Sequence, residues 1–201
     1  MIKNLLRKYK NNFTKFDKVT NFRLLNSFLV ALGLSLFSPA LIALKGQYLA
    51  AWAISMFMIL STLSVKLNKF FTTKYDINLM YRLGVLTHIL FVIVSVIYFI
   101  SPVTMIILDS VISIFETAVF SSYSILLTNY LTEKYPKHMQ EFQVVRNSTW
   151  ADGFLIGLSI SMIVSYFYGI EGVIISFTLY NSIFAGWLLY NWNFFKFLTN
   201  K

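Results

Sequence analysis

Two carboxylates, Asp109 and Glu116, stand inside a long apolar stretch of the chain. Their spacing of seven residues is nearly two helical turns, so on a helix both would lie on one face, about 10 Å apart along the axis. A charge at membrane depth is costly, by about 3 kcal/mol at a helix centre, and such residues are functional candidates. We therefore interpret the pair as a proton, cation or substrate site, with a structural hydrogen bond to another helix as the alternative.

Other polar residues extend this candidate site. Ser113 and Thr117 fall on or beside the same face, and Asn26 lies in the first apolar stretch, which also contains Pro39. A proline inside a helix frees a backbone carbonyl, so this stretch either lines a pathway or is kinked for packing. The predicted substrate or proton site consists of Asp109, Glu116, Ser113, Thr117 and Asn26.

Residues for other kinds of chemistry are scarce. The chain has no cysteine, which excludes disulfides, thiolate metal sites and a cysteine nucleophile. His88 and His138 are the two histidines, too few for a histidine metal cluster, and we interpret His88 as a hydrogen-bonded core residue. The G-x-S-x-G, H-E-x-x-H, Walker A and Gly-rich dinucleotide motifs are absent. We predict that the protein is not an enzyme and holds no cofactor or metal.

Apolar stretches of membrane length must position these residues. Hydrophobic residues make up 57% of the chain and charged residues 12%, whereas a soluble domain is about half apolar and a quarter charged. A helix needs roughly 20 apolar residues to cross the hydrocarbon core, and lipid permits only helices or closed barrels. We predict an all-α, polytopic membrane protein whose six transmembrane helices cover residues 24–44, 48–65, 83–100, 103–127, 150–167 and 172–192.

The basic residues predict the orientation of these helices. All of the 17 Lys and Arg residues except Lys45 lie in the N-terminal arm, the tail, or the two loops and flanking helix ends that share their side. Cytoplasmic loops carry such an excess, so we predict that both termini are cytoplasmic and that the membrane is a bacterial inner membrane. The net charge of +9 then requires no nucleic-acid partner.

The chain is expected to divide into three parts. In the N-terminal arm, residues 1–22, apolar residues at helical spacing alternate with Lys and Arg. This pattern is typical of an amphipathic helix on an anionic leaflet, with a basic tail that only fixes topology as the alternative. Residues 23–195 form the predicted transmembrane domain, and residues 196–201 the cytoplasmic tail.

Small and charged residues mark two further features. Small residues at every fourth position let another helix approach closely, within or between chains. In the fifth stretch this row consists of Gly153, Gly157, Ser161 and Ser165. A charge network on the cytoplasmic side is predicted from Asp76, Arg82, Arg146 and Asp152.

One local stretch and the overall layout resemble the major facilitator superfamily of transporters. Residues 128–157, TNYLTEKYPKHMQEFQVVRNSTWADGFLIG, are similar to the family's passage of acidic helix end, proline, basic loop and a helix opening D-G-F-x-x-G. The family's G-x-x-x-D-R-x-G-R-R loop motif is absent after the second helix; that loop offers Asp76, Arg82 and Gly84 at different spacing. Six helices with both ends inside correspond to one half of such a transporter.

The resemblance implies a half-size secondary transporter that acts as a dimer. The partner would be a second copy, or a different half in a heterodimer, and the substrate an unknown small molecule. The first and fourth helices would line the cavity, with proton coupling through the two acids. The second and fifth helices would form the interface, which makes the small row the candidate interface residues. The alternative function is a non-transporting, transporter-derived membrane scaffold, assembly or immunity-type protein.

Overall fold

The computed structural model describes residues 17–136 and 139–196. Most of the predicted N-terminal amphipathic arm, Lys137, His138 and most of the predicted tail therefore lie outside the described residues. Within these two ranges the regular structure is helical and no strand occurs, in agreement with the all-α prediction. The helices are α2 (Lys18–Tyr48), α3 (Ala51–Lys66), α4 (Asn68–Lys74), α5 (Ile77–Ile97), α6 (Pro102–Lys134) and α7 (Met139–Tyr190).

Side-chain caps fix where three of these helices begin. Asp17 accepts a hydrogen bond from the backbone N–H of Thr20 at 2.9 Å at the start of α2. Asp76 caps α5 in the same way, and Ser101 caps α6, where Pro102 occupies the first turn. Such caps satisfy backbone donors that lack a partner in the helix, and proline is preformed for this position. The helices therefore extend beyond the apolar stretches that predicted them.

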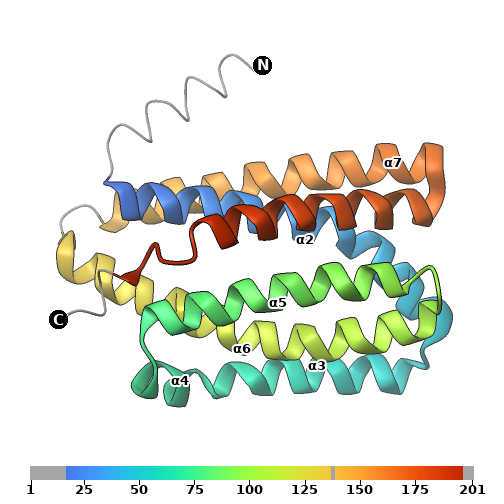
Figure 1. Ribbon diagram of the computed structural model, residues 1–201, viewed down its shortest axis with the longest axis horizontal. Helices are drawn as coiled ribbons and strands as arrows, with labels where there is room; N and C mark the ends of the chain where they lie inside the picture. The colour runs from blue at the N-terminus through green and yellow to red at the C-terminus, as the bar shows by residue number, and fades with distance from the viewer. Residues whose placement is uncertain (1–16, 137–138, 197–201) are drawn as a thin grey trace.

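Two residues redirect the long helices. Gly169 interrupts α7 with φ 63° and ψ −162°, a conformation that glycine adopts far more readily than any other residue. The chain reverses there, so α7 consists of two antiparallel arms, residues 139–168 and 170–190 (Figure 1). Pro39 lies inside α2, whose C-terminal part bends away from α7 towards α3 (Figure 1).

The helices form two layers. One layer contains α2 and both arms of α7, and the other contains α3, α5 and α6 (Figure 1). Helix α2 packs most extensively on α7, while α6 packs on α5 and α3; contacts of α5 with α7 and of α2 with α6 join the layers. Two polar contacts, Lys45 with Asp109 and Arg23 with Ser124, join α2 to α6 between the layers.

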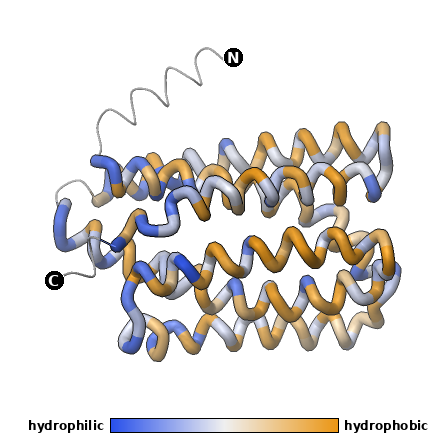
Figure 2. Tube along the Cα trace, viewed as in Figure 1, coloured by the Kyte–Doolittle hydropathy of each residue, from blue (hydrophilic) through white to orange (hydrophobic). Residues whose placement is uncertain are grey.

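The sides of this bundle suit a lipid environment. Among residues 17–136 and 139–196, five helices are long and apolar enough to cross a membrane, with α7 counted once, so the six predicted spans are not all confirmed. Large apolar side chains are exposed on them, such as Trp52 at 72%, Met162 at 68% and Ile183 at 75%. Hydrophilic residues gather towards the ends of the bundle, above all at the end where α2 begins (Figure 2). A water-soluble protein rarely exposes so much contiguous apolar surface, so the chain is an integral membrane protein.

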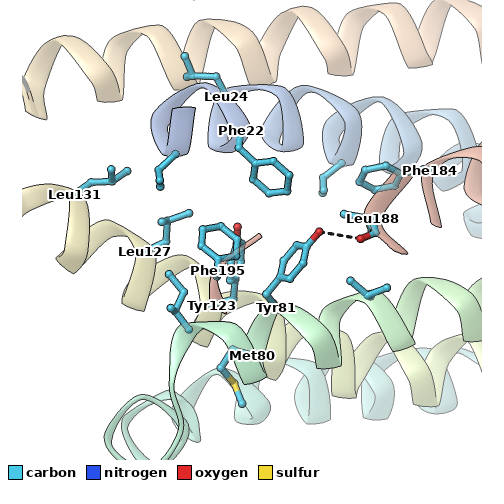
Figure 3. Packing of buried hydrophobic residues seen from close by; sticks show 14 of the residues in the cluster. Phe22, Leu24, Met80, Tyr81, Tyr123, Leu127, Leu131, Phe184, Leu188 and Phe195 are labelled. Carbon is cyan, nitrogen blue, oxygen red and sulfur yellow. Dashed lines mark hydrogen bonds between the residues drawn. The ribbon is translucent and has the colours of Figure 1, made fainter. Parts of the chain in front are cut away.

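An aromatic cluster closes the end of the bundle where α2 begins. Phe195 is fully buried, with its ring centroid 5.2–5.8 Å from those of Phe22, Tyr81 and Tyr123 (Figure 3). The Tyr81 hydroxyl donates a hydrogen bond of 3.1 Å to the backbone carbonyl of Leu188. Aromatic pairs at these distances attract beyond the area they bury, so this cluster ties α2, α5, α6 and the end of α7 together.

Candidate functional site

Asp109 faces a basic side chain on another helix. It lies in α6 and is 2% exposed, and its Oδ2 atom is 3.6 Å from the Nζ atom of Lys45 in the last turn of α2. This separation is that of an ion pair and is longer than a good hydrogen bond. An opposite charge at this distance favours the ionised carboxylate, whereas burial opposes it. Lys45 thus supplies the opposite charge that a buried carboxylate needs as a partner.

Glu116 has an equivalent arrangement two helical turns further along α6. Its Oε1 atom is 3.7 Å from the Nδ1 atom of His88 in α5, and the two side chains are 19% and 11% exposed. The His88 ring packs against Phe184 of α7, with the ring centroids 5.0 Å apart. The pair is thus a carboxyl group and an imidazole in a largely apolar wall, at a separation longer than that of a hydrogen bond.

Both acids border one cavity between the layers. It has a volume of about 80 Å³, enough for a few water molecules. Asp109, Ser113 and Glu116 line it from α6. The other lining residues belong to α2, α5 and the second arm of α7, and include Gly33, Ser38, His88, Tyr180 and Asn181.

A second, smaller cavity of about 30 Å³ continues beyond the Glu116–His88 pair. Glu116 and His88 line both cavities, and Asn26 and Tyr123 line the second. The two spaces therefore meet at the pair, and together they extend from Asp109 to the aromatic cluster.

The predicted site residues divide into two groups. Four of them, Asp109, Ser113, Glu116 and Asn26, line these two cavities. Thr117 lies elsewhere: its hydroxyl is 3.2 Å from that of Ser61 in α3 and donates to the carbonyl of Ser113. Adjacent residues on a helix are about 100° apart, so Thr117 packs on α3 while Glu116 faces the cavity.

The small row of α7 packs largely inside the chain. A Cβ atom at Gly153 would overlap the carbonyl oxygen of Phe28, and one at Gly157 would overlap the Ser35 hydroxyl and the Leu32 carbonyl. Ser161 is also buried, while Ser165 is exposed. The close approach that the spacing predicts therefore occurs between α7 and α2 of one chain.

The residues of the predicted cytoplasmic charge network each contact different partners. Asp76 caps α5, and Arg82 donates a 2.7 Å hydrogen bond to Asn193 and lies over the ring of Trp192. Arg146 donates to the neighbouring Asn147, and Asp152 is partly buried in the first arm of α7. The geometry thus gives Asp76 and Arg82 different partners.

Three basic residues that sequence reasoning did not assign to a site contact the buried polar groups. Lys45 was expected in a loop, but α2 continues through it and brings it to Asp109. His88 was interpreted as a core histidine, yet it faces Glu116. Arg23 was counted with the N-terminal charges, yet it is 4% exposed. Their position in the sequence could have indicated this role, because each stands inside or at the edge of an apolar stretch.

The walls of the two cavities come from a single chain. Helices α2, α5, α6 and the second arm of α7 supply their lining. The second copy expected beside the polar face of α6 stays a prediction. Across residues 17–136 and 139–196, no three His, Asp or Glu residues come together in a way that could hold a metal ion.

Compared with known proteins, the chain matches no family model, no curated protein and no solved structure. The resemblance to one half of a major facilitator superfamily transporter therefore stays a prediction from the sequence.

Proposed function

We propose that the protein is a proton-linked secondary transporter whose pathway runs through one six-helix bundle. A single observation carries this proposal: two carboxylates at membrane depth border the same cavity, and each faces a basic group on a different helix. Intramembrane acids that face a polar cavity are typical of proton relays and ion pathways.

Six crossings follow if each arm of α7 spans the membrane. The arms, residues 139–168 and 170–190, both reach the length of roughly 20 residues that a span needs, and the reversal at Gly169 lies between them. The charge distribution then puts the end of the bundle where α2 begins in the cytoplasm. In this orientation Asp109 lies nearer the outside and Glu116 nearer the inside.

Protonation provides a means of coupling the two layers. A proton on Asp109 removes the charge that attracts Lys45 of α2. This event therefore loosens one contact between α6 and α2, while a proton on Glu116 changes the hydrogen bonding that its carboxyl can offer to His88 of α5. A substrate cation would exchange with these protons, since both need the same carboxylates.

The pathway in this proposal needs no second chain. A homodimer or heterodimer would pack through the exposed apolar faces of α3 and the first arm of α7 and would add no wall to the cavities. The half-size layout would then correspond to a complete transporter in one chain.

The competing function is a non-transporting membrane scaffold. The small volumes of the two cavities and the missing loop motif of the superfamily favour it. In that case the two acid–base pairs would only hold the helices together.

Proton flux in reconstituted vesicles separates the two functions. Purified protein in liposomes with an enclosed pH-sensitive dye should change the internal pH faster than empty liposomes when Na⁺, K⁺ or an organic cation such as ethidium is added outside, because a coupled transporter moves protons only in exchange for its cation. Asp109→Asn and Glu116→Gln should each abolish this flux while the protein still folds, because they keep shape and hydrogen bonding but remove the titratable group. Glu133→Gln, an exposed acid of the same helix, is the matched control and should behave as wild type. Unchanged flux in both cavity variants, or no flux in the wild type, would leave the scaffold as the function.

A further inference from the structure

A buried arginine that forms no ion pair with any acid of the described residues lies at the end of the bundle where α2 begins. Arg23 is 4% exposed, and its Nη2 atom donates to the hydroxyl of Ser124. The guanidinium lies 5.8 Å from the ring centroid of Phe120 and 5.6 Å from that of Tyr123. Its Nη1 atom is buried with no hydrogen-bond partner among the described residues.

This arrangement leaves Arg23 incompletely satisfied. Burying a charged donor is costly unless it is both paired and hydrogen-bonded. The two rings offer a cation–π attraction, and Ser124 offers one neutral acceptor, but neither supplies a negative charge. The missing component is an anion with oxygen atoms that can accept from Nη1.

A cavity lies where such an anion would be placed. It has a volume of about 290 Å³ and shares one lining residue, Phe120, with the smaller cavity beside Glu116. A second arginine, Arg146 of α7, lines it together with Ser27, Ser124, Asn147 and Trp150. No carboxylate is among the residues that line it.

We infer that this cavity, between Arg23 and Arg146, is a binding site for a phosphate group. Two guanidinium groups with hydroxyl and amide donors beside them match the several oxygens and the charge of a phosphate, and guanidinium is the side-chain group best shaped for such contacts. The phosphate belongs either to the headgroup of an anionic lipid or to a small soluble organic phosphate. The site is distinct from the acid-lined cavities and does not depend on transport.

The binding test uses the full chain in detergent and in nanodiscs. Glycerol 3-phosphate should raise the unfolding temperature of the detergent-solubilised protein if the ligand is soluble. If the ligand is a lipid, the protein released from mixed nanodiscs should retain phosphatidylglycerol in preference to phosphatidylcholine. Native mass spectrometry counts the lipid molecules that stay bound. Arg146→Gln should weaken whichever binding occurs by about tenfold or more, since it removes one charged set of donors.

Control variants make the result specific. Arg82→Gln removes an arginine that already has Asn193 and Trp192 as partners, and it should bind as wild type. Asp109→Asn should also bind as wild type, so that a failed transport proposal leaves this result unaffected. Arg23→Gln should abolish binding; because it alters a buried position, Arg146→Gln carries the test if that variant does not fold.

Three results would overturn the inference. The first is no binding of either probe to the wild type. The second is equal binding by wild type and Arg146→Gln. The third is equally effective competition by acetate, which would show a general anion effect and no phosphate site.

Discussion

The contact between Lys45 and Asp109 places two charged side chains where helices of a membrane protein ordinarily have apolar residues. The carboxylate is buried, so removing its partner leaves a charge without compensation, which costs about 3–5 kcal/mol when both groups are fully buried. Lys45 is 20% exposed, and water moderates this effect. We predict that Lys45→Met lowers the free energy of unfolding in detergent by about 2 kcal/mol.

The double variant shows whether the loss comes from the pair. Lys45→Met combined with Asp109→Asn removes both charges, so it should be more stable than the sum of the two single variants predicts. Thermal unfolding of the four proteins gives the coupling energy. Strictly additive losses would mean that the 3.6 Å contact contributes nothing to stability.

Asp17 provides a pH-dependent contribution outside the membrane-spanning segments. Partial burial acts to raise the pKa of its carboxyl, but hydrogen bonds from the Tyr135 hydroxyl, from Thr20 and from Lys134 outweigh it and lower the pKa from 3.8 to about 2. A lowered pKa in the folded state stabilises the fold above about pH 4. This stabilisation is lost as the pH falls from about 4 to about 2.

We therefore predict that Asp17→Asn is less stable than wild type at pH 6 and nearly equal to it only at about pH 1.5, below the folded-state pKa of about 2. The difference at pH 6 should be about 1 kcal/mol, because the side chain is 27% exposed and water screens its charge. Unfolding temperatures measured across this range check the trend, with Glu133→Gln as the control for a general acid effect. A difference that stays constant with pH would contradict the assigned role of the carboxylate.

At the scale of the elements, the contact between α2 and α7 depends on Gly157. A methyl group there would overlap the Ser35 hydroxyl and the Leu32 carbonyl, so the two helices would have to separate. Gly157→Ala should cost about 2 kcal/mol of stability, as overpacking in a close-packed interior typically does. Thermal unfolding in detergent measures this loss.

Gly186 is the matched control in the same helix. A Cβ atom there has no neighbour within 4 Å, so Gly186→Ala should be neutral or stabilising by up to about 1 kcal/mol through helix propensity. Equal effects of the two substitutions would mean that the close approach of α2 and α7 does not limit stability.

Sequence patterns predicted the existence of the helices better than their ends. The apolar stretch at 103–127 predicted α6, which continues to Lys134 because a helix ends at its caps and contacts, beyond the edge of its apolar core. The same extension of α2 brings Lys45 to Asp109. Helical spacing correctly placed Asp109, Ser113 and Glu116 on one face, but spacing within one helix cannot identify partners on another. His88 and Arg23 therefore became site residues only once the helices were packed.

At the scale of the whole molecule, the packing gives each chain its own cavities. Charged and aromatic groups succeed one another between the layers, from the Lys45–Asp109 pair through Glu116 and His88 to the cluster around Phe195. Composition predicted a membrane protein because apolar surface must be solvated by lipid. It could not predict whether the polar face of α6 was covered by another chain or by α2, since both give the same pattern of residues.

The topology of the six proposed crossings can be tested directly because the chain has no cysteine. Single cysteines at Gly46, Ile100 and Glu171 should react with an impermeant thiol reagent in intact cells, since these positions lie near the end of the bundle that the positive-inside rule puts outside. Cysteines at Thr73 and Glu133 should react only after permeabilisation. Both sets are at exposed positions, so differences in reactivity report the side of the membrane. If Gly46 and Ile100 were labelled from outside but Glu171 only from inside, the two arms of α7 would not each cross the bilayer. This result would contradict the six-helix bundle on which the transporter proposal depends.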